Sequence, residues 1–285
     1  KQSVPPAHLA RGFASTETFR RVGFLVGPLL AAGLLAASDG FVVGFQRVLL
    51  VAVAFGVAAT VAQHVLYEAG EDTVGKSFGG LAAVADDLRS LPAPLRPLLV
   101  GDTLVRFANG MVYVFFVIVV VDFLSVGVSA FGRTLRPDAF FGVLLAVEMV
   151  VALLTMVPVA RLAERVGLKP VVGLGFAVYA VFPILLINAP ADPIVVGALF
   201  AFSGLRFAGL PAHKALIVGP AEADAGGRVT GSYYLVRNVV VIPSAALGGW
   251  LYAGDPRLAF GLATAVGLLG TAVFLVFGRE FEAYA

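Results

Sequence analysis

Glu148 is an ionisable residue in the middle of a long apolar run, where it could bind a charged solute or exchange a proton. Apolar residues extend from Phe140 to Val147 before it and from Met149 to Leu154 after it. A charge at the centre of a membrane-spanning helix costs about 2.5–3.5 kcal/mol on insertion scales. Burial disfavours the charged form of a carboxylate, so Glu148 is a candidate proton-coupling residue. The alternatives are a structural role, or a neighbouring arginine that keeps the carboxylate ionised.

A second group of polar residues recurs at helical spacing, with steps of four, three and four. It consists of Asp102, Arg106, Asn109 and Tyr113. A helix presents such residues on one face. Asp102 is a second candidate for proton coupling, and the other three are candidates to line a substrate path. The simpler alternative is an Asp102–Arg106 ion pair that only supports the helix.

Two later runs add candidates for the substrate path. They are Arg206, Tyr234, Arg237 and Asn238. Arg206 could instead brace one end of its helix. Arg20 and Arg21 lie early in the first run, and their long side chains could reach the membrane surface rather than a cavity.

The elements that position these residues must be transmembrane helices. Of the 285 residues, 59% are hydrophobic and 13% are charged, whereas a soluble domain has about 45–50% apolar and about 25% charged residues. The chain must therefore lie mostly in the lipid bilayer, which excludes a soluble enzyme and a nucleic-acid-binding protein. Cysteine is absent, so there is no thiolate metal site and no disulfide.

Eight runs reach the length of about 20 apolar residues that a bilayer-spanning helix needs. They lie near residues 16–37, 41–67, 97–124, 138–160, 170–188, 193–217, 228–252 and 257–278. Backbone groups in lipid must be satisfied within the segment, and the runs lack the alternation of a β-barrel. We therefore expect an all-α, polytopic transmembrane helical bundle of eight helices.

Positive charge at the helix ends predicts the orientation. Eleven Lys and Arg residues lie at one set of ends, and four lie at the other: Arg47, Arg133, Arg136 and Arg257. Because cytoplasmic loops carry the excess of Lys and Arg, we expect a multi-pass cell-membrane protein with both termini of this segment in the cytoplasm. The longest connection, residues 68–96, is expected to be a cytoplasmic linker, either solvated or with an amphipathic helix over 77–91. It separates two helices in 1–67 from six in 97–285.

The first and seventh runs resemble each other. The first begins Arg11-Gly-Phe-Ala-Ser15 and the seventh begins Arg228-Val-Thr-Gly-Ser232, an offset of 217 residues. Internal repeats are typical of transporters. If the repeat unit has six helices, the first unit lacks its first four.

The stretch after the fourth run resembles the loop motif of the major facilitator superfamily, G-x-L-A-D-R-x-G-R-K. The matching residues are Leu162, Ala163, Arg165, Gly167 and Lys169, and the departures are Ala160, Glu164 and Leu168. Gly167 permits a tight turn. Arg161, Glu164, Arg165 and Lys169 are candidates for a gating loop whose ion pairs steady one access state. We expect Glu164 beside Arg165, Lys169 or the start of the seventh helix.

The first run adds Gly23-x-x-x-Gly27-Pro28-x-x-Ala31-Ala32-Gly33. This is similar to the motif G-x-x-x-G-P-x-x-G-G on the fifth helix of proton-coupled exporters in the superfamily. Small residues at this spacing, here Gly23, Gly27 and Gly33, allow close helix packing, and Pro28 can bend the helix.

The resemblance implies a partial major-facilitator-type fold, in which the eight helices are the fifth to twelfth of twelve. The charge-poor second, fifth and eighth helices would be peripheral, and the missing N-terminal helices would be partners of this chain. The implied function is secondary active transport of a small solute by alternating access, with proton-coupled efflux by antiport as the finer expectation. An uncoupled facilitator or a channel-like membrane protein is the alternative.

Enzymatic activity is not expected. His8, His64 and His213 are far apart in the sequence, and the motifs H-E-x-x-H and G-x-S-x-G do not occur. We therefore expect no catalytic residue, no metal and no cofactor. The expected partners are the lipid bilayer, a small-molecule substrate and protons.

Overall fold

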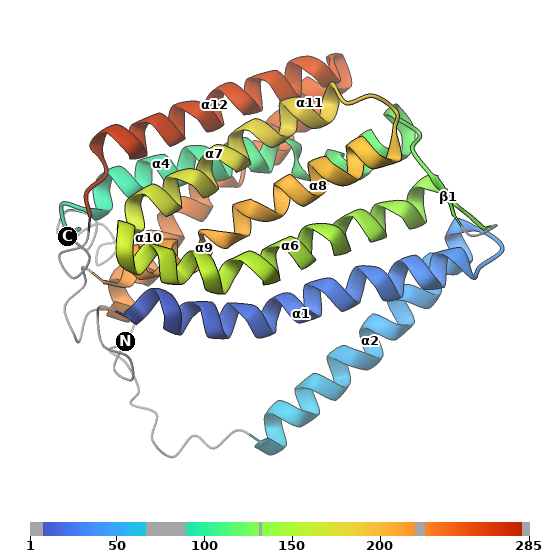
Figure 1. Cartoon of the computed structure of the whole chain (residues 1–285), viewed down its shortest axis with the longest axis horizontal. Coiled ribbons are helices and arrows are strands. Elements are labelled where there is room, and N and C mark those ends of the chain that lie inside the picture. The colour runs from blue at the N-terminus through green and yellow to red at the C-terminus, as the bar shows by residue number, and fades with distance from the viewer. Residues whose placement is uncertain (1–7, 67–88, 90, 131–132, 220–225, 281–285) are drawn as a thin grey trace.

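The computed structural model describes residues 8–66, 89, 91–130, 133–219 and 226–280, which are almost entirely helical (Figure 1). Eight helical segments within these ranges are long and apolar enough to cross a membrane. They coincide with the eight expected runs, so the prediction of an all-α polytopic bundle is confirmed. Most of the expected linker at 68–96, with its amphipathic helix, lies outside the described residues.

The first two spans are α1 (Leu9–Ala36) and α2 (Phe41–Leu66). In Figure 1, α1 lies alongside α6 (Pro137–Val166), while α2 lies at the edge of the molecule. α1 begins at Leu9 rather than near residue 16. Leu9 and Ala10 are buried, so packing of this first turn stabilises a helical start that the polar sequence did not indicate.

The third span is the least regular. It consists of α4 (Leu95–Val112), a 3₁₀ turn η2 (Tyr113–Phe115), the short α5 (Phe116–Ile118) and a π-helical turn η3 (Val119–Phe123). Such interruptions often accompany functional regions of a helix. A small antiparallel hairpin that we did not expect follows, with β1 (Val128–Ala130) paired to β2 (Arg133–Leu135).

The expected gating loop is mostly helical. α6 continues to Val166, and α7 (Leu168–Ile187) begins after Gly167 alone. Gly167 has φ +91°, and a Cβ there would lie 2.5 Å from Glu280 Oε2. The tight turn at this glycine is confirmed, because only glycine adopts this backbone conformation readily.

The last three spans are each punctuated by Pro, Gly or Asp. The sixth is α8 (Pro193–Ala208) followed by α9 (Leu210–Val218), the seventh is α10 (Gly226–Val241) followed by α11 (Ser244–Gly254), and the eighth is α12 (Pro256–Phe277). The side chains of Asp192 and Asp255 accept hydrogen bonds from the first backbone N–H groups of α8 and α12. Such capping, with Pro at the first helical position, fixes where these helices begin.

The fifth span corrects one expectation. We predicted that it would be peripheral because it carries no charge, yet 67% of the apolar window of α7 is buried, compared with 6% for α2 and 39% for α12. α7 packs against α12 and α8. A helix without charges is compatible with lipid and with a packed interior alike, so its composition could not decide between them.

Candidate functional site

A cavity of about 280 Å³ lies between α1, α4, α6, α7 and α8. Its charged lining consists of three arginines and one carboxylate: Arg21, Arg106, Arg206 and Glu148. The remaining lining is aromatic, apolar or neutral: Phe24, Pro28, Asn109, Tyr113, Leu145, Met149, Tyr179 and Phe207. Residues from five different spans therefore converge on one cavity that combines charged and apolar walls.

Glu148 forms a buried ion pair with Arg206 on the wall of this cavity. Arg206 Nη2 lies 2.8 Å from Glu148 Oε1, and both side chains are 3% exposed. Ser203 Oγ donates a hydrogen bond to the same oxygen. α8 reaches α6 closely because of Gly204, where a Cβ would lie only 2.5 Å from the Glu148 carbonyl oxygen. The arginine that we considered as an alternative partner of Glu148 is therefore present.

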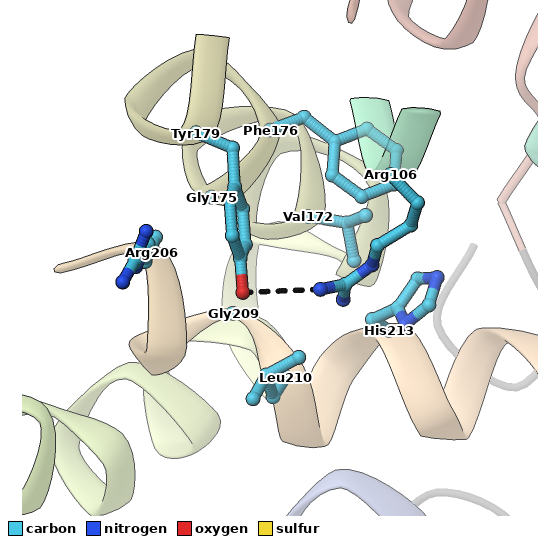
Figure 2. A pocket seen from close by; sticks show the side chains of 9 residues that line it. All are labelled: Arg106, Val172, Gly175, Phe176, Tyr179, Arg206, Gly209, Leu210 and His213. Atoms are coloured by element: carbon cyan, nitrogen blue, oxygen red, sulfur yellow. Dashed lines mark hydrogen bonds between the residues drawn. The ribbon is translucent and has the colours of Figure 1, made fainter. Parts of the chain in front are cut away.

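Tyr179 of α7 separates this ion pair from a second charged group. Its hydroxyl accepts a hydrogen bond of 3.1 Å from Arg106 Nη1, as Figure 2 shows. The guanidinium groups of Arg106 and Arg206 lie 4.8 Å and 5.0 Å from the centroid of its ring. One aromatic side chain thus contacts two cations through its π face.

The second charged group surrounds Asp102, which is fully buried. Its carboxylate lies 3.3 Å from Arg106 Nε and accepts a 3.0 Å hydrogen bond from Arg237 Nη1. Tyr233 donates a hydrogen bond of 3.1 Å, and His213 Nε2 lies 3.3 Å away. The expected Asp102–Arg106 pair is therefore part of a polar cluster from three helices, α4, α9 and α10.

A third carboxylate, Glu17 of α1, is also buried. It contacts Arg20 at 3.0 Å, Arg21 at 3.8 Å and the amine of Lys214 in α9. The Lys214 contact joins α1 to the helix that carries His213. Arg21 does not reach the membrane surface, since it is 5% exposed, whereas the Arg20 side chain is 55% exposed.

Glu164 lies near the end of α6 and contacts the start of α1. Arg11 Nη2 donates to Glu164 Oε2, and His8 Nδ1 lies 3.4 Å from Oε1. We expected partners at Arg165, Lys169 or the start of the seventh helix. Among the described residues, the partners come from the start of the first helix, whereas the side chains at 226–229, where the seventh helix begins, lie outside the description. Arg161 and Arg165 are exposed, and the backbone N–H of Lys169 bonds Glu280.

The seventh span carries three of the expected substrate-path residues, Tyr234, Arg237 and Asn238, but none of its described residues lines the cavity. In the described residues, α10 contributes Tyr233 and Arg237 to the Asp102 cluster but none of the cavity lining. Tyr234 lies under the Arg237 guanidinium at 4.6 Å, and Asn238 is exposed and accepts from Arg237. Their role in a substrate path stays a prediction.

The three glycines of the α1 motif, which we call the glycine stripe, do not contact another helix within the described ranges. A Cβ at Gly23, Gly27 or Gly33 would have open space around it. The close contact between α1 and α6 is formed elsewhere, where a Cβ at Gly142 would lie 2.8 Å from the Pro28 carbonyl oxygen and 2.9 Å from Ala32. A packing role for the stripe stays a prediction.

Four residues of the charged clusters were not predicted from the sequence: Tyr179, Tyr233, His213 and Lys214. A hydroxyl in an otherwise apolar helix was an available signal for Tyr179, because a buried tyrosine oxygen usually has a hydrogen-bond partner. Tyr233 shares its helix face with Arg237 at a spacing of four, which was also readable. His213 and Lys214 gave no such signal, since their partners come from distant helices.

A bundle of eight membrane-spanning helices around a charged cavity is the architecture of a polytopic membrane transport protein. The family description "Major Facilitator Superfamily" matches residues 98–284. The chain therefore belongs to the major facilitator superfamily, whose members are transporters rather than enzymes, and it is a multi-pass membrane protein. A comparison with curated proteins gives no match. Within the described residues, no group of three His, Asp or Glu side chains could hold a metal ion.

Proposed function

We propose that the protein is a secondary active transporter that moves a small solute by alternating access and couples this movement to protons, as an efflux antiporter of the cell membrane. The observation that carries the proposal is the Glu148–Arg206 pair on the wall of the cavity. Protonation of Glu148 would remove the charge that holds Arg206. Arg206 would then leave the position in which it lines the cavity, so proton binding and solute binding would compete, as antiport requires.

The Asp102 cluster supports the same proposal. It touches the cavity through Arg106, and it is the second candidate for a proton site. Arg106, Asn109 and Tyr113 lie on the cavity wall, as a substrate path along this helix face requires. Arg237 would act on the path indirectly, through its bond to Asp102.

The exposed apolar faces of α1, α2 and the seventh span support the proposal that further helices pack against this chain. Only 11% of the apolar window is buried in α1 and in the seventh span, and 6% in α2. We propose that 1–67 contributes two helices to one bundle and that 97–285 forms the other bundle. Both termini of this segment would lie in the cytoplasm. Four further helices of the same transporter would cover the exposed faces of α1, α2 and the seventh span. Four more hydrophobic helices encoded upstream of Lys1 would support this proposal, and an upstream stop codon in the same frame would contradict it.

A second candidate is an uncoupled facilitator. Glu148 has both an ion-pair partner and a hydroxyl donor, which are the contacts of a buried carboxylate that only supports the structure. The two candidates differ in whether a pH gradient drives accumulation.

The test is transport in liposomes that contain a pH-sensitive dye. The panel of solutes comprises organic anions, organic cations and neutral molecules, and protein-free liposomes provide the baseline. We expect that a concentration gradient of one of these three classes of solute drives proton movement across the membrane, which the dye reports. Glu148→Gln should abolish accumulation driven by a pH gradient and retain solute counterflow, whereas Glu148→Asp should retain both. Accumulation by Glu148→Gln at the parental level would contradict coupling through Glu148.

A further inference from the structure

The cavity carries more positive than negative charge. Arg21, Arg106 and Arg206 line it, and Glu148 is the one carboxylate among its described lining residues. Glu148 is already paired with Arg206 at 2.8 Å. The carboxylate beside Arg106 is Asp102, which also bonds Arg237. Arg106 and Arg237 therefore share the carboxylate of Asp102. Of the three arginines that line the cavity, the remaining one has the weakest compensation of its charge.

Arg21 is that third cation. It is 5% exposed, and the acceptors beside it are the Met149 sulfur at 3.9 Å and a Glu17 oxygen at 3.8 Å. Glu17 is also contacted by Arg20 and Lys214. Arg21 Nε has no hydrogen-bond partner within the described part of the chain. A guanidinium offers five donors, and a buried cation without a close oxygen partner is costly.

A neighbouring space has the same character. The small pocket in Figure 2, with a volume of about 10 Å³, is lined by Arg106, Arg206 and His213, and its described lining contains no carboxylate. The main cavity itself is lined by Arg21, Arg106 and Arg206, so an anion in it would meet guanidinium groups from three helices. Charge-assisted hydrogen bonds from arginine to such oxygens are among the strongest in proteins.

The other walls of the cavity are apolar. Phe24, Leu145, Met149 and Phe207 lie around the arginines. The Arg21 guanidinium lies 4.1 Å from the centroid of the Phe207 ring, which holds it against this apolar surface. A volume of about 280 Å³ is slightly below the range of about 300–1,000 Å³ typical of sites for drug-sized ligands.

We infer that the solute is a small organic anion with an aromatic or otherwise apolar body, and that Arg21 receives its anionic group. This inference rests on the proposed function, because it names the substrate class of the same cavity. The anion supplies the close oxygen acceptors that Arg21 lacks among the described residues, and the apolar body contacts Phe24 and Phe207.

Three probes of similar shape test the inference at neutral pH, where one is an anion, one is neutral and one is a cation. They are benzenesulfonate, neutral benzenesulfonamide and the cation phenyltrimethylammonium, measured by calorimetry on the protein in lipid nanodiscs. Benzenesulfonate should bind about tenfold or more tightly than the sulfonamide, because hydrogen bonds to a charged group are worth more than those to a neutral group. The cation should not bind.

Arg21→Gln should weaken benzenesulfonate binding about tenfold and leave sulfonamide binding unchanged, while Arg21→Lys should lose less. Arg20→Gln is the matched control, because Arg20 contacts the same Glu17 but is outside the cavity lining. It should change binding about twofold at most, as expected for an exposed pair. Thermal unfolding of each variant verifies that it is folded.

Equal binding of sulfonate and sulfonamide, preferential binding of the cation, binding of none of the three probes, or an unchanged sulfonate affinity in folded Arg21→Gln would each overturn the inference. None of these results touches the transport proposal, which fails only if the whole solute panel shows no protein-dependent movement in liposomes. The two failures are therefore distinguishable.

Discussion

Asp102 is the residue on which most of the polar interior depends. Its carboxylate is completely buried and faces Arg106, Arg237, Tyr233 and His213. A buried charge pair contributes little net stability when it is intact, but the removal of one partner leaves an uncompensated charge in a low-dielectric interior. Here the removal of a single carboxylate would leave two guanidinium groups facing each other.

Asp102→Asn should therefore lower the free energy of unfolding by about 3–5 kcal/mol, measured in mixed micelles of increasing SDS content. Asp122→Asn is the control, because Asp122 is an exposed carboxylate on the same span. A loss no larger than that of the control would show that the cluster does not depend on the charge of Asp102.

At the scale of elements, the contact between α6 and α8 decides whether the Glu148–Arg206 pair can form. Gly204 allows this contact, since a Cβ there would lie 2.5 Å from the Glu148 carbonyl oxygen and 2.7 Å from Val151 Cβ. Backbone atoms cannot move aside as a flexible side chain can, so a larger residue would separate the two helices.

Gly204→Ala should lower the thermal unfolding midpoint and lengthen the Glu148–Arg206 contact, at a cost of about 1–3 kcal/mol from overpacking. Gly197→Ala is a matched control on the same helix, because a Cβ at Gly197 has open space around it. It should be neutral or stabilising, since alanine is the better helix former. The same loss in both variants would mean that helix packing at Gly204 is not the cause.

At the scale of the whole molecule, the start of α1 and the end of α12 lie at the same end of the bundle (Figure 1). Leu9 and Ala10 belong to the same apolar cluster as residues of α4, α7, α9 and α10. The ion pairs of Glu164 with Arg11 and of Glu17 with Lys214 add polar contacts across the same junction. Alternating access requires such contacts to form in one state and to break in another.

Glu164→Gln should loosen this end without unfolding the protein. The sequence has no cysteine, so cysteines introduced at Val65 and Val166 would be the only sites that a thiol-directed spin label modifies. Both residues are exposed near the ends of α2 and α6. The distance distribution between them should broaden or lengthen in the variant. Asp138→Asn, which removes an ion pair with Arg136 in another part of the bundle, should leave it unchanged. Identical distributions for Glu164→Gln and the parent would contradict a gating role for Glu164.

The sequence by itself determined the number and approximate extent of the spans. This was possible because a backbone in lipid must satisfy its own hydrogen bonds, so length and apolarity are sufficient to identify helices. It also determined that Asp102 and Arg106 share a helix face, because that follows from the helical period. The tight turn at Gly167 could be predicted for a similar reason, since it depends on one residue type.

Only the tertiary structure decided which helices meet. The pairing of Glu148 with Arg206, the position of Tyr179 between two arginines and the pairing of Glu164 with Arg11 all join residues that are distant in the sequence. Each depends on the rotation, tilt and depth of two helices relative to each other. The helical period fixes the face of a residue on its own helix, but close approaches such as that at Gly204 fix the neighbour that this face meets.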